Sequence, residues 1–291
     1  MANAEKKAMI KKNNGEDILY HFIQKRLMQR DPKLAKTFIK HAINALSIWF
    51  HPTFYQTIPI ILPFVVRDSS CRKNKQTGAD EWASPNPKGL LRDDNSLVKS
   101  KVKSMLVESP DGIYKNCAIG NGFVASHIWR QTDDIGELAS RDPWLNTFVP
   151  NLVWLPKQIS KMTDREGEFA QQYVQLLARH IYGNIEFRPP LQQRIEKIWD
   201  RLPEPADLQE DLPEVEKLNF FIPNEKILLN RRKDIVDVIS ALRKASVREP
   251  IDKKVIASRY TQGLHSVSAN NLTLLANELQ DYFNELPPLE H

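Results

Sequence analysis

Helical periodicity dominates both ends of the chain. Apolar residues recur three or four positions apart over residues 6–30 and again from residue 32 to about residue 50, where Asp31 followed by Pro32 is a typical helix start. The same spacing predicts further helices, over residues 96–106, 159–182, 188–202, 224–245, 252–262 and 268–286. The pattern therefore predicts a mainly helical protein.

The middle of the chain has a different pattern. Residues 122–128 and 151–155 are short β-like runs, separated by a polar loop and followed at once by the helix predicted from residue 159. A further short strand is expected at residues 60–66, inside a segment rich in prolines and turn residues. We therefore predict an α+β fold in which a central strand, loop, strand and helix are flanked by N- and C-terminal helical regions.

The domain organisation follows from these elements and from one change of composition. We expect residues 1–110 to form a helical and basic-loop region, 111–202 the central core, and 224–288 a C-terminal helical region. Residues 203–223 are expected to be a linker, because Pro203 to Glu216 contains six acidic residues, several prolines and no Lys or Arg. The final Leu-Glu-His, residues 289–291, resembles the remnant of a purification tag and is left out of the fold prediction.

Composition narrows the class of protein. With 41% hydrophobic residues the 291-residue chain can build a core, and its longest apolar run, residues 58–66, is far too short and too proline-rich to span a membrane. The two cysteines and the polar first residues favour a cytoplasmic location and exclude a zinc site built from cysteines. The net charge of +5 permits nucleic-acid binding without requiring it, although basic residues are concentrated in the N-terminal third.

Two segments of the central region carry candidate chemistry. Phe123-Val-Ala-Ser-His-Ile128 places a histidine at the end of the first predicted strand, and Asn151-Leu-Val-Trp-Leu-Pro places an asparagine at the start of the second, just before the helix. This arrangement, over residues 120–166, resembles the HNH or ββα-metal nuclease motif. The resemblance implies an endonuclease of the restriction type that hydrolyses DNA phosphodiester bonds with a divalent cation, Mg²⁺ or Mn²⁺.

The resemblance assigns a role to each residue. His127 would be the general base that activates water, since a neutral imidazole suits this task near pH 7. Asn151 would brace the loop or the imidazole, and the cation would stabilise charge on the phosphate. Arg130 and Lys157 follow the two segments and would hold phosphate. Other basic residues are expected to contact double-stranded DNA: Arg72, Lys73, Lys75 and Arg92.

The chain departs from the family pattern at both usual metal-binding positions. Ser126 and Ser160 stand where the family has Asp, His or Asn, and neutral hydroxyls are weak ligands for hard cations. Asp164, one helical turn after Ser160, and Asp133 and Asp134 in the connecting loop are candidate replacements. The alternative is a catalytically silent DNA- or protein-binding module on the same scaffold. A homodimer is expected if two sites cut two strands.

Two competing motifs have less support. Gly120-Asn-Gly-Phe-Val-Ala125 matches a dinucleotide-binding fingerprint, but no alternation of strands and helices follows it. Pro110-Asp111 matches the first half of the PD-(D/E)xK nuclease signature. No Asp or Glu stands two positions before a Lys between residues 112 and 157, so this dipeptide is better explained as part of a turn.

Overall fold

The centre of the protein is a mixed sheet. The structure, a computed structural model, describes residues 14–68, 71, 81–114, 117–134 and 136–289. Six strands lie in the order β5-β4-β8-β1-β7-β6, with β1 and β8 parallel and the other neighbours antiparallel. They are β1 (Ile48–Phe50), β4 (Leu106–Glu108), β5 (Cys117–Ala118), β6 (Phe123–His127), β7 (Leu152–Pro156) and β8 (Asn219–Phe221). A separate parallel pair consists of β2 (Val65–Arg67) and β3 (Leu91–Asp93).

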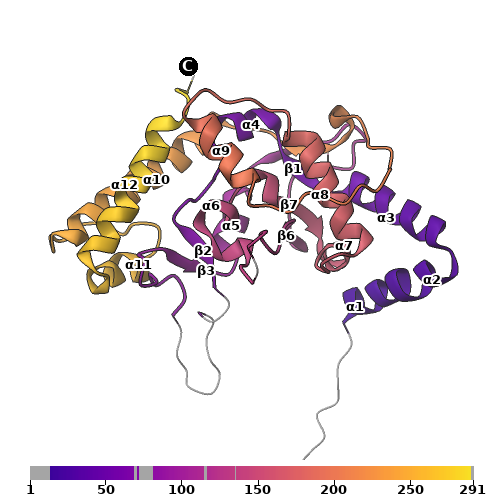
Figure 1. The fold of residues 1–291 in the computed structure, drawn as a ribbon, viewed down its shortest axis with the longest axis horizontal. Coiled ribbons are helices and arrows are strands. Elements are labelled where there is room, and N and C mark those ends of the chain that lie inside the picture. The colour runs from indigo at the N-terminus through magenta and orange to yellow at the C-terminus, as the bar shows by residue number, and fades with distance from the viewer. Residues whose placement is uncertain (1–13, 69–70, 72–80, 115–116, 135, 290–291) are drawn as a thin grey trace, which may run out of the picture.

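Helices surround this sheet and make up most of the regular structure, which confirms the predicted α+β, mainly helical class (Figure 1). The N-terminal part of the chain forms α1 (Gly15–Tyr20), a π-helix (His21–Leu27), α2 (Met28–Arg30), α3 (Pro32–Leu46) and α4 (Pro52–Thr57). The central helices are α5 (Ser96–Lys101), α6 (Pro143–Asn146), α7 (Lys157–Thr163), α8 (Phe169–Tyr182) and α9 (Leu191–Trp199). The C-terminal helices are α10 (Glu225–Ser246), α11 (Ser258–Gly263) and α12 (Ala269–Glu285), and α10 packs along α12 at one end of the molecule.

Short 3-10 turns complete the described elements: Ala139–Arg141, Val149–Asn151, Val215–Lys217 and Leu264–Ser266. No helix in the described ranges is long and apolar enough to cross a membrane. The predicted helix over residues 159–182 is in fact two helices, α7 and α8. Gly167 adopts a positive φ of 75° between them, a conformation that glycine tolerates and that interrupts a right-handed helix.

Strand β8 lies inside the segment that we expected to be a linker. It is fully buried between β1 and β4, and its Phe221 ring packs edge-on against Trp154 at 5.1 Å and beside Phe50 at 5.6 Å. Residues 219–221 therefore belong to the centre of the sheet. The two consecutive aromatic residues Phe220 and Phe221 outweigh the polar sequence before them, because both are buried in the sheet.

The acidic stretch before β8 is also attached to the protein surface. Lys40 of α3 contacts Glu210 at 2.6 Å, and Arg179 of α8 contacts Glu204 at 2.6 Å. These ion pairs neutralise part of the positive charge on α3 and α8, the helices that the acidic stretch contacts. The basic surface is therefore smaller than the sequence alone suggests.

The central position of β8 can be tested by stability. Replacing the fully buried Phe221 by Ala should lower the free energy of unfolding by about 3–5 kcal/mol, because it removes a large core side chain. Glu216→Ala, at an exposed position of the same segment, should change it by less than about 0.5 kcal/mol. Urea unfolding measures both. Equal, small effects would mean that the segment is a linker after all.

Candidate functional site

The predicted strand, loop, strand and helix are all present. β6 and β7 are antiparallel neighbours at one edge of the sheet, with His127 opposite Leu152 and Phe123 opposite Pro156. α7 begins at Lys157, immediately after β7, and packs against both strands. His127 therefore lies at the end of β6, where the connecting loop leaves the sheet.

Among the described residues, Asn146 is the one that forms hydrogen bonds with the imidazole of His127. Its Nε2 lies 2.9 Å from the backbone oxygen of Asn146 and 3.0 Å from the side-chain Oδ1. The Nδ2 of Asn146 donates to the backbone oxygen of Val65 at 3.0 Å, which turns Oδ1 toward the imidazole. A backbone carbonyl can only accept, so Nε2 must carry the hydrogen.

This assignment leaves the other ring nitrogen as the basic one. In the neutral imidazole with hydrogen on Nε2, Nδ1 carries a free lone pair. Nδ1 of His127 is buried and has no hydrogen-bond partner among the described residues, and the residue as a whole is 7% exposed. A buried polar atom without a protein partner is a place where water or a ligand can bind.

The surroundings keep His127 uncharged. Burial lowers its pKa to about 4, and the positive charges of Arg67 and Arg130 act in the same direction. The hydrogen bonds to Asn146 oppose this shift but do not offset it. At neutral pH the ring is therefore a free base.

Asn151 braces the loop that follows β6. Its Oδ1 accepts a hydrogen bond from the backbone N–H of Trp129 at 2.7 Å, and its Nδ2 donates to the backbone oxygen of Leu145 at 3.0 Å. It is fully buried and contacts both the start of the loop and the helix that carries Asn146. Asn151 is therefore a positioning residue, which holds the loop rather than the imidazole.

The two serines at the usual metal positions differ in their bonding. Ser126 is buried, and its Oγ has no partner among the described residues. The Ser160 hydroxyl donates to the backbone oxygen of Lys157 at 2.9 Å, within its own helix. Ser160 is thus engaged in a local helix contact.

The candidate carboxylates are spread over two places. Asp164 is half-buried at the end of α7, where burial raises its pKa and the charges of Arg130 and Lys161 oppose the rise. Asp133 and Asp134 are exposed in the loop after β6, where the backbone N–H of Asp133 donates to the backbone oxygen of Arg201 at 3.0 Å.

The described residues contain no group of three or more His, Cys, Asp and Glu side chains that could hold a metal ion. The predicted ligands on β6 and α7 are the Ser126 and Ser160 hydroxyls, which are weak donors, and the Asp164 carboxylate. A hard cation requires more oxygen ligands than these three residues supply. The donor set that the structure describes does not fit the expected Mg²⁺ or Mn²⁺.

Among the residues predicted to contact DNA, Arg130 is the one whose positive charge lowers the pKa of His127. Its guanidinium donates a hydrogen bond to the backbone oxygen of Asp164. Lys157 is exposed but forms an ion pair with Glu16 at 2.9 Å. Arg92 is paired with Glu81 and lies 3.9 Å from Asp68. Three further candidates lie outside the described residues: Arg72, Lys73 and Lys75.

Sequence analysis missed two residues of this site. Arg67 ends β2, and its charge lowers the pKa of both His127 and Asp164. Asn146 fixes the imidazole but stands 19 positions from it in the chain. The sequence signal that could have pointed to Arg67 is its position directly after the apolar run at residues 60–66.

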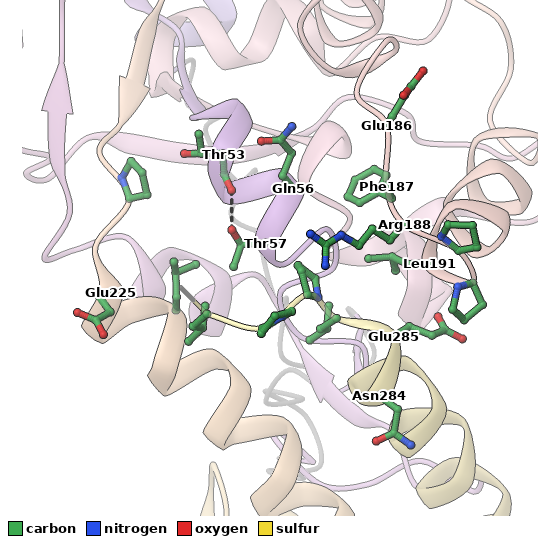
Figure 2. Close-up of a pocket in the computed structure, with 18 residues that line it drawn as sticks. Thr53, Gln56, Thr57, Glu186, Phe187, Arg188, Leu191, Glu225, Asn284 and Glu285 are labelled. Atoms are coloured by element: carbon green, nitrogen blue, oxygen red, sulfur yellow. Dashed lines mark hydrogen bonds between the residues drawn. The ribbon is translucent and has the colours of Figure 1, made fainter. Parts of the chain in front are cut away.

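A cavity of about 670 Å³ lies elsewhere in the fold, bounded by α4, the segment before α9, and the ends of α10 and α12 (Figure 2). Polar residues from several elements surround it, among them Thr53, Arg188 and Asn284. None of its lining residues comes from β6, β7 or α7. This cavity is therefore separate from the ββα element.

Comparison with protein-family models, curated proteins and solved structures found no match for this chain. The case for a nuclease therefore rests on residues 120–166 and on the geometry around His127.

The buried, uncharged imidazole has a consequence for stability. The folded-state pKa of about 4 lies below the ordinary value of 6.5, so the unfolded chain takes up a proton first as the pH falls. Stability contributed by neutral His127 is thus complete above pH 6.5 and lost toward pH 4. Between pH 7.5 and 4.5 the free energy of unfolding of the wild type should fall by about 2–3 kcal/mol more than that of His127→Gln.

Urea unfolding at several pH values measures this difference. His265→Gln, at an exposed position, is the matched control and should follow the wild type. Parallel curves for wild type and His127→Gln would contradict the buried neutral imidazole.

Proposed function

We propose that this protein is an HNH-type endonuclease that hydrolyses phosphodiester bonds of double-stranded DNA, with His127 as general base. One observation carries the proposal: Asn146 fixes the tautomer of His127 so that the unpartnered Nδ1 is the basic nitrogen. Its place at the end of β6, in a strand, loop, strand and helix, supports the same function.

In the proposed reaction, Nδ1 of His127 removes a proton from water as the water oxygen attacks phosphorus. A new P–O bond forms, the bond to the leaving oxygen breaks, and that oxygen takes a proton from solvent. Asn146 accepts the Nε2 hydrogen throughout and stabilises the imidazolium that forms. Arg130 supplies positive charge near the phosphate.

The pKa of about 4 belongs to the protein without DNA. A bound phosphodiester brings negative charge beside Arg67 and Arg130, which favours the protonated ring and raises the pKa of His127 toward the working pH. Because Nδ1 is covered in this structure, DNA binding must also open the site. A homodimer would place two such sites on the two strands.

A second candidate function is a DNA- or protein-binding module that keeps the ββα scaffold without catalysis. The burial of His127 favours it, since a covered imidazole cannot contact water or phosphate without a rearrangement. Tight DNA binding without cleavage would support this candidate.

Plasmid and sequence-diverse genomic DNA, each incubated with Mg²⁺, Mn²⁺ or EDTA, test the proposal. Wild type should cut, and His127→Ala should cut at least about 100-fold more slowly, because a general base contributes roughly this much. His265→Ala should cut like the wild type. Absence of cleavage under every condition would refute the enzyme, and unchanged cleavage by His127→Ala would refute the assignment of the base.

A further inference from the structure

Helix α1 packs along α7, the helix of the ββα element (Figure 1). Glu16 of α1 forms an ion pair with Lys157 at 2.9 Å, and the carboxylate of Asp17 lies 3.7 Å from the ammonium group of Lys161. Lys157 and Lys161 are four positions apart, so they lie on one side of α7. Two adjacent acidic residues thus neutralise two lysines on that side.

The contact continues one turn further along the chain. The guanidinium of Arg165 lies over the ring of Tyr20, 5.0 Å from its centroid, and the Tyr20 hydroxyl donates to the carboxylate of Glu168 at 2.6 Å. Three cations spaced four positions apart therefore each contact a side chain of α1. We call these three residues the basic row: Lys157, Lys161 and Arg165.

The basic row ends beside the loop that follows His127. Arg130 in that loop donates a hydrogen bond to the backbone oxygen of Asp164, the residue just before Arg165. DNA bound along the basic row would therefore lie next to the loop of the proposed active site.

The contacts of α1 are of a kind that a competing anion can replace. None of the residues of α1 is fully buried, whereas the π-helix that follows it buries Ile23 and Gln24. Lys157 and Lys161 remain 56% and 39% exposed, and ion pairs between exposed groups contribute little stability and are weakened by salt. α1 can thus leave α7 while the π-helix keeps its buried anchor.

Duplex DNA offers a row of phosphates that bind Lys and Arg side chains. The carboxylates of Glu16 and Asp17 occupy the lysines that such phosphates would contact. We propose that the basic row is a DNA-contacting surface and that α1 is an autoinhibitory cover, which DNA displaces when it binds. This inference rests on the proposed function, from which it takes duplex DNA as the ligand.

DNA binding by the full-length protein tests the cover. The probe is a fluorescein-labelled duplex of random sequence in low-salt buffer with EDTA, and fluorescence anisotropy gives the Kd. A denaturing gel of each sample shows that the duplex is intact. Glu16→Gln/Asp17→Asn should lower the Kd about tenfold, because it frees the two lysines for phosphate. The gain should shrink as salt is added, since salt screens the ion pairs that hold α1 in the wild type.

A matched control separates this effect from net charge. Glu214→Gln/Asp252→Asn removes the same two negative charges and also frees two lysines, Lys217 and Lys244, on other elements. It should change the Kd less than about twofold, because these lysines lie outside the basic row.

Two further variants identify the groups involved. In a protein with Lys157→Gln/Lys161→Gln, adding Glu16→Gln/Asp17→Asn should give no gain beyond that of the control, because the lysines it would free are absent. Glu16→Asp/Asp17→Glu keeps both charges and should bind DNA like the wild type.

Three results would overturn the inference: no gain in affinity from Glu16→Gln/Asp17→Asn, an equal gain from the control, or a gain that persists without the two lysines. If the wild type still cuts DNA in any of these cases, the proposed function stands without the cover. A gain that depends on the lysines, in a protein that never cuts DNA, would leave the cover standing and refute the endonuclease.

Discussion

The pair of hydrogen bonds from His127 to Asn146 is the interaction on which the rest of the site depends. Both partners are oxygens of Asn146, and one of them is a backbone carbonyl, which can only accept a hydrogen bond. The ring nitrogen Nε2 that faces them must therefore donate. The same contact lowers the free-energy cost of burying the ring, because it gives Nε2, one of the two ring nitrogens, its hydrogen-bond partners. The other atom, Nδ1, has no partner among the described residues, and the proposed role of His127 as general base follows from that.

The fold explains why this contact forms. Asn151 ties both ends of the loop between β6 and β7, and the loop carries α6 and Asn146 back to the end of β6. On the other side, β2 receives the Nδ2 hydrogen bond of Asn146. The imidazole is thus positioned by two strands and one loop, which is the rigidity that a general base requires. Positive charge comes from Arg67 and Arg130, at the edges of the same elements.

Sequence reasoning succeeded where the signal was local. The ββα element, with His127 at the end of one strand and Asn151 just before the next, could be predicted because residues 122–160 carry alternating patterns and a short motif. The roles of Asn146, Arg67 and β8 could not be predicted from the sequence, because they depend on contacts between segments that are distant in the chain. A three-residue buried strand has no periodicity to detect, and the acidic residues before β8 resembled a linker because their basic partners lie on other helices.

The tautomer of His127 is the most direct test of this account. Nitrogen-15 NMR of histidine-labelled protein at pH 7, with His127→Gln to assign the signal, distinguishes a protonated from an unprotonated ring nitrogen. We predict a neutral ring with hydrogen on Nε2 and no hydrogen on Nδ1. A hydrogen on Nδ1, or a ring that is fully charged at pH 7, would contradict it and remove the basis for His127 as the base.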